Sequence, residues 1–443
     1  MLKANLKIIS ELKEFLIKVS NNMVYLSMFK NSESDFTRKR KLTFDNLVLI
    51  ITRLCKKTLS VEIDSFFAEI DPSMSCSVPA FSLQRAKLNP AFFYSWNTVL
   101  WQSFYSEYGN KVKLWKGKKV IACDGSNISL VNKPALRNYF GGQSNQTSSF
   151  VVAKTFYCYD VLNKIVLFPQ IAPYRYGELR MAYDIINRAP IQEDMLMVFD
   201  RNFSNYKIAA LFQWKEKEIK YVIRVKDSLN FFKKFVRSKK KSSVIEIFPS
   251  PASITGLKEV GFIVKKDTPL KIRLIRIKLP NKKIEVLMTN LWEEEGYDAC
   301  EFKTLYSLRW GVESNIDFQK NILQLESISG LSPISVIQDF YATVFVSNLH
   351  FLLIKQAQEI ITTNDPERKY PMQVNNNKAF GKIKTIIISL FISEIPKQIL
   401  ETLNNYFIRS PLPIRKNRSF PRIRKNRQSN SKHRTFTNYK PAY

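Results

Sequence analysis

Histidine and cysteine are scarce in this sequence. Two histidines and five cysteines occur among 443 residues. The cysteines are odd in number and scattered, with no Cys-x-x-Cys pair, so neither a disulfide framework nor a zinc knuckle is expected. Scattered thiols indicate a reducing compartment, and we expect a cytoplasmic protein. The five are Cys55, Cys76, Cys123, Cys158 and Cys300.

Acidic residues are also few in comparison with basic ones. The chain has 38 Asp and Glu against 69 Lys and Arg, which gives a net charge of +31. Self-repulsion of this size does not favour a compact fold, so the charge predicts a polyanionic partner. Two weaker explanations remain open, a Lys-, Asn- and Ile-rich genome and a membrane surface. The hydrophobic share of 45% is typical of a globular protein.

Long hydrophobic runs are missing as well. The longest apolar stretch, residues 340–354, contains Ser347, Asn348 and His350. It is too short and too polar to be expected to cross a bilayer. Charged side chains interrupt every apolar run near the start of the chain, so no signal peptide is expected. We therefore expect no membrane partner.

The length predicts two or three domains, because one hydrophobic core rarely serves a chain of this size. Residues 1–110 show helical periodicity and are interpreted as an N-terminal, DNA-binding region. Residues 111–226 and 284–355 are interpreted as one core, interrupted by a Lys-rich, β-rich insertion at 227–283. Residues 356–443 are expected to form a C-terminal helical region with a basic tail.

The core is predicted to be an α/β mixed sheet flanked by helices, because strands come first and helices and strands then alternate. Its strands are expected at 119–124, 149–161, 164–171, 195–200, 221–226 and 285–289. Helices are expected at 177–188, 206–217, 298–325, 333–354 and 382–395. Strands of the insertion are expected at 244–248, 259–264 and 271–279.

Two basic segments have open interpretations. A short helix at 79–87 places Gln84, Arg85 and Lys87 near one another, either as a solvated face or as a DNA contact. The tail from residue 409 to residue 440 contains eleven Lys or Arg and no acid. It is expected to contact a phosphate backbone, or else to be a solubilising tail.

Two acids stand at the ends of apolar strands. Asp124 ends one predicted strand and Asp200 ends another, and each opens into a polar turn. If the strands are neighbours in one sheet, both acids lie at the same edge, where chemistry collects in open α/β sheets. A single acid in this context is usually a turn residue or a helix cap.

Four functional side chains share one stripe of the helix predicted at 298–325. At about 100° per residue, Tyr306, Arg309, Glu313 and Lys320 fall within about 60° of one another. A salt bridge between residues four apart explains Arg309 and Glu313 alone. It leaves Tyr306 and Lys320 unexplained.

This spacing is similar to the YREK motif of transposases of insertion-sequence family four. The segment from Asp200 to Phe203, Asp-Arg-Asn-Phe, resembles the family's Asp-Arg-Gly-Phe at the second acid, with Asn202 in place of Gly. Asp124-Gly-Ser resembles the surroundings of the first acid. The resemblance covers roughly residues 40–350.

The resemblance implies an RNase H-like core and a mechanism that depends on two Asp and one Glu. Two Mg²⁺ ions would be held by carboxylates, and Mn²⁺ would substitute for them. Mg²⁺ takes hard oxygen ligands, so no histidine or cysteine is required. The implied catalytic metal ligands are Asp124, Asp200 and Glu313, with Asp317 next in line for the third place. The implied DNA contacts are Tyr306, Arg309 and Lys320.

The implied function is cut-and-paste transposition. The protein would bind the ends of an insertion sequence on double-stranded DNA, cleave strands and transfer them, as a homodimer in the cytoplasm of a bacterium. Some members stack a flipped base on a Trp at a position where this chain has Glu285, so Trp292 and Trp310 are the nearby alternatives. Two other functions stay open, a metal-dependent nuclease without strand transfer and a decayed DNA-binding protein.

Overall fold

The computed structural model describes residues 1–38, 40–144, 149–363 and 369–415. Residues 1–110 contain six helices in the described part. They are α1 (Leu2–Asn21), α2 (Met23–Ser27), α3 (Phe44–Thr52), α4 (Leu59–Ile70), α5 (Val78–Arg85) and α6 (Ala91–Tyr108). Side chains cap several of them, as where Thr43 accepts a hydrogen bond from the Asn46 N–H at the start of α3.

A mixed sheet forms the centre of the molecule, which confirms the predicted α/β class. The order of its main path is β2-β3-β1-β6-β7-β10-β9-β8, and two further strands, β4 and β5, pair with β3. Strand β1 runs parallel to β6, and β6 runs parallel to β7, whereas the remaining pairs are antiparallel. The strands preceding residue 200 are β1 (Lys119–Leu130), β2 (Gly142–Ser144), β3 (Ser149–Asp160), β4 (Ile165–Val166), β5 (Gln170–Pro173) and β6 (Met195–Phe199). Those following it are β7 (Lys220–Arg224), β8 (Ser242–Ile247), β9 (Leu270–Lys278) and β10 (Ile284–Thr289).

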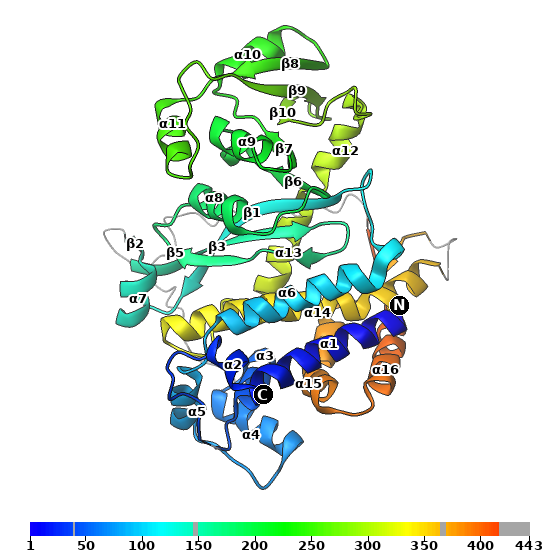
Figure 1. Ribbon diagram of the computed structural model, residues 1–443. Helices are drawn as coiled ribbons and strands as arrows, with labels where there is room; N and C mark the ends of the chain where they lie inside the picture. Colours follow the sequence, from blue (N-terminus) through cyan, green and yellow to red (C-terminus); the bar gives the residue numbers. More distant parts are fainter. Residues whose placement is uncertain (39, 145–148, 364–368, 416–443) are drawn as a thin grey trace.

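Helices cover both faces of this sheet. The helices predicted at 177–188 and 206–217 are present as α8 (Glu178–Arg188) and α9 (Tyr206–Gln213). Helix α7 (Pro134–Phe140) was not predicted. Residues 227–283 contain α10 (Asn230–Arg237) and α11 (Pro251–Lys258) besides β8 and β9. Figure 1 shows α10, α11, β8 and β9 at the top, β1 and β3 in the middle, and α1 and α6 below.

Two strand predictions were wrong in detail. The segment 259–264 is not a strand, because α11 ends at Lys258 and the chain turns through Gly261, whose φ of +91° suits glycine. The strand expected at 164–171 is divided into β4 and β5. Between these two strands lies Pro169, which has no N–H for a ladder hydrogen bond.

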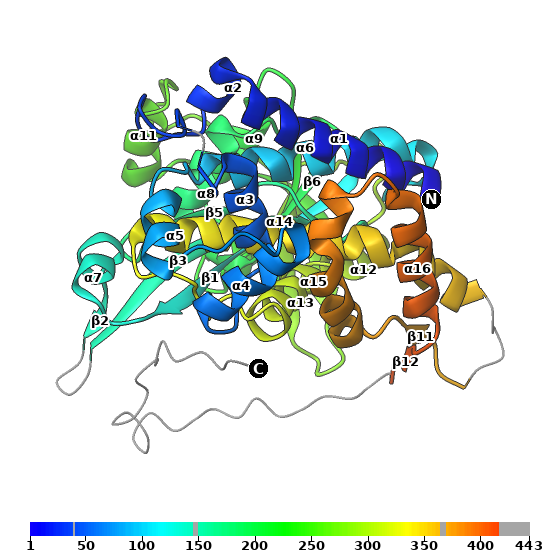
Figure 2. The same ribbon diagram turned by 90° about the horizontal axis from the view of Figure 1, so that it is seen from below.

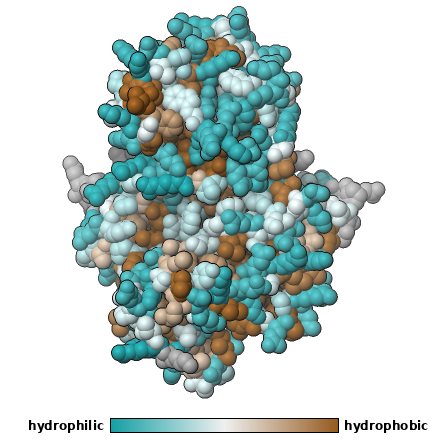
Figure 3. Space-filling model, viewed as in Figure 1, coloured by the Kyte–Doolittle hydropathy of each residue, from teal (hydrophilic) through white to brown (hydrophobic). Residues whose placement is uncertain are grey.

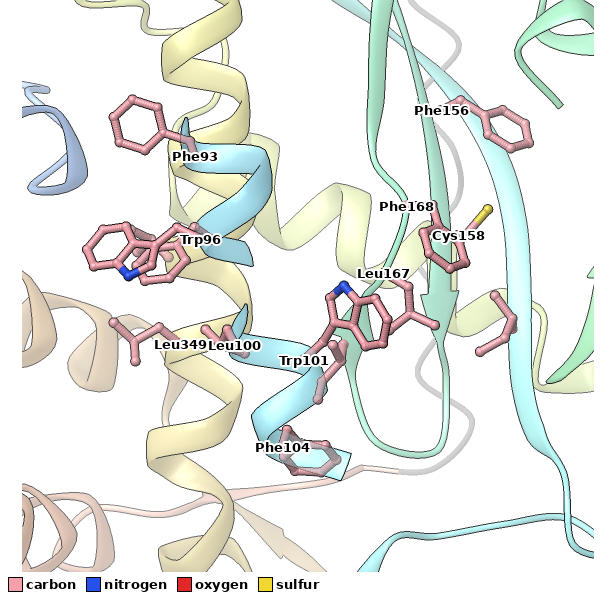
Figure 4. Close-up of a cluster of buried hydrophobic side chains, with 14 of the residues drawn as sticks. Phe93, Trp96, Leu100, Trp101, Phe104, Phe156, Cys158, Leu167, Phe168 and Leu349 are labelled. Carbon is pink, nitrogen blue, oxygen red and sulfur yellow. The ribbon is translucent and has the colours of Figure 1, made fainter. Parts of the chain in front are cut away.

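One long helix joins the helical region to the sheet. Helix α14 (Pro333–Thr363) packs against α6, α3 and β4, and its Phe345 ring stacks on Trp96 of α6 at 4.0 Å. Figure 4 shows Trp96, Leu100 and Leu349 at this contact, and Figure 2 shows α1 and α3 near α14 from below. By length and composition α14 could cross a membrane, but 83% of the apolar window is buried inside the protein. Core helices of water-soluble proteins pass the same test.

The surroundings of the short helix α5 bear on the open interpretation of Gln84, Arg85 and Lys87. Arg85 is buried and donates hydrogen bonds to Gln338 and Asp339 of α14, at 2.6 and 2.7 Å. Gln84 is buried too and donates to the Leu42 carbonyl. Arg85 therefore holds α5 against α14, and Gln84 holds it to the segment before α3, so neither is exposed for a DNA contact. Lys87 is partly exposed and lies 3.9 Å from Asp35, and its DNA contact stays a prediction.

The C-terminal part of the described chain is helical. Helices α15 (Asn376–Ile392) and α16 (Pro396–Ile408) follow α14, and a short ladder joins β11 (Met372–Gln373) to β12 (Leu412–Pro413). Most of the predicted basic tail, from residue 416 onward, lies outside the described residues.

Candidate functional site

Asp124 and Asp200 lie side by side on neighbouring parallel strands. Cys123 of β1 is level with Phe199 of β6, so the acids that follow them are level too. Asp124 lies within β1, and its Oδ1 accepts a hydrogen bond from the Gly125 N–H at 2.8 Å. Asp200 follows β6, and its Oδ1 accepts from the Asn202 N–H at 2.7 Å. Strand β1 continues past Asp124 to Leu130, so the prediction that Asp124 ends its strand was wrong. The two acids are nevertheless level with each other, at the point where β6 ends.

The helix expected at 298–325 is broken into pieces. A 3-10 turn, Ala299–Glu301, leads into α12 (Phe302–Ser307), and α13 (Trp310–Asp317) follows after a tight turn. In that turn the Arg309 N–H donates to the Tyr306 carbonyl, three residues back. A π-helical turn, Phe318–Ile322, completes the segment. The stripe of an ideal helix therefore describes this segment only approximately.

Arg309 ties the third acid to the first. Its Nη2 donates to Glu313 Oε1 at 2.8 Å, and its Nη1 lies 3.4 Å from Asp124 Oδ2. The arginine side chain is 8% exposed, so this contact is shielded from water. Burial lowers the pKa of Arg309, but Tyr306, Glu313 and Asp124 outweigh it and the net shift is upward. Asp124, Arg309 and Glu313 are thus one linked group.

The carboxyl of Asp124 is held in an unfavourable environment for its charge. Burial raises its pKa to about 6, while the Arg309 charge and the Gly125 N–H oppose the rise. The charges of Asp200 and Glu313 contribute to this same rise, because both acids lie near Asp124. Converging carboxylates of this kind are typical of functional sites.

Tyr306 lies behind Arg309 rather than on the surface. Its side chain is buried, and the Arg309 guanidinium lies 5.9 Å from the ring centroid. Burial raises the pKa of Tyr306, and Arg309 lowers it. Next to it, Arg224 of β7 pairs with Glu285 of β10 at 2.7 Å. Tyr306 is placed to support Arg309 from inside the protein.

Lys320 and Asp317 point to different places. Lys320 Nζ donates to the Asn127 carbonyl of β1 at 2.6 Å, and burial lowers the pKa of this lysine. Asp317 is exposed and accepts a hydrogen bond from Asn321 at 2.5 Å. The structure therefore brings Lys320 to the strand of Asp124 and leaves Asp317 in solvent.

The aromatic alternatives also differ. Trp310 is 57% exposed and lies beside the site, with the Arg309 guanidinium 4.8 Å from its ring centroid. Trp292 follows β10 and lies 5.5 Å from Lys271 Nζ. Glu285 stands at the position where a base-stacking Trp was considered, and its carboxylate forms an ion pair with Arg224. Of the two tryptophans, only Trp310 contacts a residue of the site in the described chain.

Glu178 was not predicted from the sequence, yet its carboxylate lies at this site. A Cβ added to Gly125 would come within 2.6 Å of Glu178 Cδ, so the Glu178 side chain would have to move aside for any larger residue. Glu178 pairs with Lys154 at 3.2 Å, and Asn202 Nδ2 lies 3.5 Å from its other oxygen. Glu178 thus contacts residues adjoining both aspartates. Its position as the first residue of α8 was the available signal.

A small hollow opens beside the second acid. It measures about 330 Å³ and is lined by Asp200, Arg201, Asn202, Lys226, Asp227 and Ser228. Acids and bases alternate on its wall. A phosphate group or a hydrated cation is small enough to enter it.

The donor set fits a divalent cation by its chemistry. Asp124, Asp200 and Glu313 offer carboxylate oxygens, which Mg²⁺ and Mn²⁺ prefer. In the described part of the chain no three His, Cys, Asp or Glu side chains stand close enough to hold an ion. Arg309 lies between two of the acids, so its guanidinium must move before they can approach one ion.

Comparisons with known proteins point in one direction. Residues 115–349, more than half of the chain, match the family described as a transposase DDE domain. The chain is 25% identical over 166 residues to the putative transposase InsZ of Escherichia coli (strain K12). That match takes in 37% of this chain and 54% of the relative, so the chain spans about half the length of InsZ.

A solved structure shows a more distant likeness. The piggyBac transposase synaptic complex with hairpin DNA, determined by cryo-EM, is similar with a TM-score of 0.39 and 12% identity. The alignment covers 95% of this chain and 87% of that chain. At this level the likeness carries no argument about fold or mechanism.

Proposed function

Because the chain belongs to the transposase DDE domain family, we propose that it is an insertion-sequence transposase that cleaves DNA strands and transfers them. One observation carries this proposal: Asp124 and Asp200 are level on parallel strands, and Arg309 joins Glu313 to Asp124. We assign the three acids to the metal site. We also propose that the core is RNase H-like and that the chain belongs to insertion-sequence family four through its YREK motif.

In this proposal Asp124, Asp200 and Glu313 would hold two Mg²⁺ ions, and Mn²⁺ would substitute for Mg²⁺. Bound ions of this kind activate an attacking oxygen and stabilise the leaving oxygen of a phosphodiester. The chain's own residues bind and orient the DNA. Arg309, once released from the carboxylates, presents a guanidinium fork to a phosphate, and Tyr306 supports it from the protein interior. Lys320 adds a second positive charge near the strand of Asp124.

The substrate is double-stranded DNA, namely the ends of the element and its target. Two ends must be paired, so we propose a homodimer in the cytoplasm of a bacterium. A DNA-binding protein without catalysis is less well supported, because all three acids are present, Asp124 is level with Asp200, and Arg309 joins Asp124 to Glu313. A nuclease without strand transfer would use the same acids, and only its products distinguish it.

The test is cleavage of labelled DNA carrying the element's own ends, in Mg²⁺ and in EDTA. Wild type is compared with Glu313→Gln and with the matched control Asp317→Asn, one helical turn further on. We expect wild type and the control to cut at the ends only with Mg²⁺, and Glu313→Gln to bind without cutting. Cutting by Glu313→Gln would overturn the assignment of the third acid.

Two further readouts complete the experiment. Mn²⁺ binding followed by electron paramagnetic resonance should weaken at least tenfold in Asp124→Asn, independently of cleavage. Joining of a released 3′ end to a second duplex would support transposition. Equal nicking of any DNA, without joining, would replace transposition by nuclease activity.

A further inference from the structure

The insertion carries a large excess of positive charge. Residues 227–283 include fifteen Lys or Arg and four Asp or Glu. Figure 3 shows that the surface at the top of the molecule, where Figure 1 places α10 and β8, is mostly hydrophilic. A charge excess usually means only a solvated face. Whether the positive charge of the insertion has a function therefore depends on where its lysines lie relative to the acids.

The register of the sheet places one group of these lysines beside the acids. Phe199 of β6 is level with Ile223 of β7, so Asp200 is level with Arg224. Arg224 is level with Leu287 of β10, and Leu287 with Ile275 of β9. Ile275 is in turn level with Ser242 of β8. One continuous row of paired residues thus runs across the sheet from the acids to its far strand.

Six lysines lie just beyond this row, on the edge where the acids stand. They belong to the end of β9, to the β9–β10 turn and to the segment that leads into β8. All six are exposed, and none of their ammonium groups forms an ion pair or a hydrogen bond with any residue that the structure describes. We call them the basic ledge: Lys239, Lys240, Lys241, Lys278, Lys282 and Lys283.

The ledge has the dimensions of a DNA contact. Four strand spacings separate β6 from β8, which is about 19 Å at about 4.8 Å each. That distance matches about five to six base-pair steps of duplex DNA. Lys226, at the hollow beside Asp200, lies between the acids and the ledge. The acids facing this edge are Asp227, at the same hollow, and Glu285, which Arg224 neutralises.

We propose that the basic ledge binds the phosphate backbone of duplex DNA and guides it away from the acids along the edge of the sheet. The partner is a DNA duplex because six ammonium groups gathered along one edge of the sheet, beside the acids, complement the closely spaced phosphates of a duplex. The proposal rests on the proposed function for the nature of the partner. It adds which surface binds the duplex and in which direction the duplex leaves.

The test compares matched triple variants of the full chain. One replaces Lys239, Lys240 and Lys241 with Gln, and a second replaces Lys278, Lys282 and Lys283. The control replaces Lys258, Lys265 and Lys266 with Gln. It removes the same amount of positive charge from the opposite edge of the insertion. The Kd for a labelled random-sequence duplex of about 30 base pairs is measured in EDTA, between about 50 and 200 mM salt.

We expect each ledge variant to lower the slope of log Kd against log salt by up to about 2.7, at about 0.9 for each phosphate contact. The control should keep the slope of wild type. A ledge variant with an unchanged slope, or a control that loses as much, would overturn the proposal.

Cleavage separates this inference from the proposed function. If wild type binds through the ledge but Mg²⁺ produces no cutting, the ledge stands and the catalytic assignment fails. If wild type cuts at the ends while both ledge variants bind as wild type does, only the ledge fails.

Discussion

At the scale of single residues, the site is built at a cost in stability. The pKa of Asp124 is raised to about 6, chiefly by burial, although the Arg309 charge opposes the rise. An acid with a raised pKa binds its proton more tightly when folded, so ionising it above pH 6 destabilises the fold. The destabilisation diminishes as pH falls through 6 and disappears below the pKa of the unfolded chain.

Asp124→Asn should therefore be more stable than wild type when no metal is present. We expect a gain on the order of 1–3 kcal/mol at pH 8 and a smaller gain at pH 5. Urea unfolding in EDTA at both pH values measures it. A variant less stable than wild type at pH 8 would show that the carboxylate contributes more through Arg309 than it costs through burial.

Gly125 and Glu178 make a second prediction at this scale. A methyl group at position 125 would overlap the Glu178 carboxyl, so Gly125→Ala must push that side chain away from Lys154. We expect a loss on the order of 1 kcal/mol in the free energy of unfolding. In a Glu178→Ala background the overlap is gone, and the same change should cost less than half as much.

Equal losses in both backgrounds would mean that the methyl group meets the backbone of α8 or β1 instead. The comparison also explains why Glu178 escaped prediction. An acid in the first turn of a helix is ordinary because it interacts favourably with the helix dipole. Only the sheet register reveals that this particular helix begins above Gly125.

At the scale of elements, the sequence predicted which segments form strands better than where each strand begins and ends. Asp124 and Asp200 follow uninterrupted apolar runs, so the two parallel strands were visible in the sequence. The segment 259–264 looked equally apolar but became a turn after α11. Alternating apolar residues alone do not reveal a missing hydrogen-bonding neighbour.

The helix that carries Glu313 shows another limit of sequence reasoning. Its residue spacing correctly grouped Arg309 with Glu313, which are paired at 2.8 Å. The tight turn before Trp310 and the π-helical turn after Asp317 were missed. Both depend on packing against the sheet, and a period of 3.6 residues assumes a straight helix.

Helix α5 gives a prediction about the attachment of the N-terminal helices. Arg85→Ala would leave the buried Asp339 without its guanidinium partner, which lies at 2.7 Å. Losses on the order of 3–5 kcal/mol are typical of this kind of change. Leu83→Ala, on the same helix but 72% exposed, is the control and should change stability by less than about 0.5 kcal/mol.

The pair should also make stability sensitive to acid. Burial raises the pKa of Asp339, but Arg85 and the Ser329 hydrogen bonds outweigh it and the net shift is downward. The stabilisation is present above the pKa of the unfolded chain and is lost as pH falls through the folded pKa. Thermal unfolding of both variants from pH 7 to about pH 2 spans this window, because the folded pKa lies below the ordinary value of Asp. A loss below about 1 kcal/mol for Arg85→Ala at pH 7 would contradict the argument.

At the scale of the whole molecule, the net charge of +31 opposes compactness. Raising KCl from about 20 to 200 mM shortens the screening distance from roughly 20 Å to below 10 Å. We expect the melting temperature in EDTA to rise by about 1 °C for roughly 1 kcal/mol gained, because an unfolding entropy of about 2.1 cal/mol/K per residue makes the shift small in a chain of this size. Differential scanning calorimetry measures it.

A flat or falling melting temperature would show that ion pairs lost to screening matter more than self-repulsion. Sucrose at matched osmolality is the control, because it stabilises folded proteins without screening charge. The outcome also bears on DNA binding, since a fold strained by its own charge gains more from a polyanion.

The insertion shares one uninterrupted sheet with the strands that carry the acids. Backbone hydrogen bonds run from β1 through β6, β7, β10 and β9 to β8, without a linker between them. The insertion therefore cannot swing on a hinge, and any motion relative to the acids must twist the whole sheet. A nucleic acid held along that edge would have to conform to a fixed frame, so curvature in the complex would be borne by the duplex.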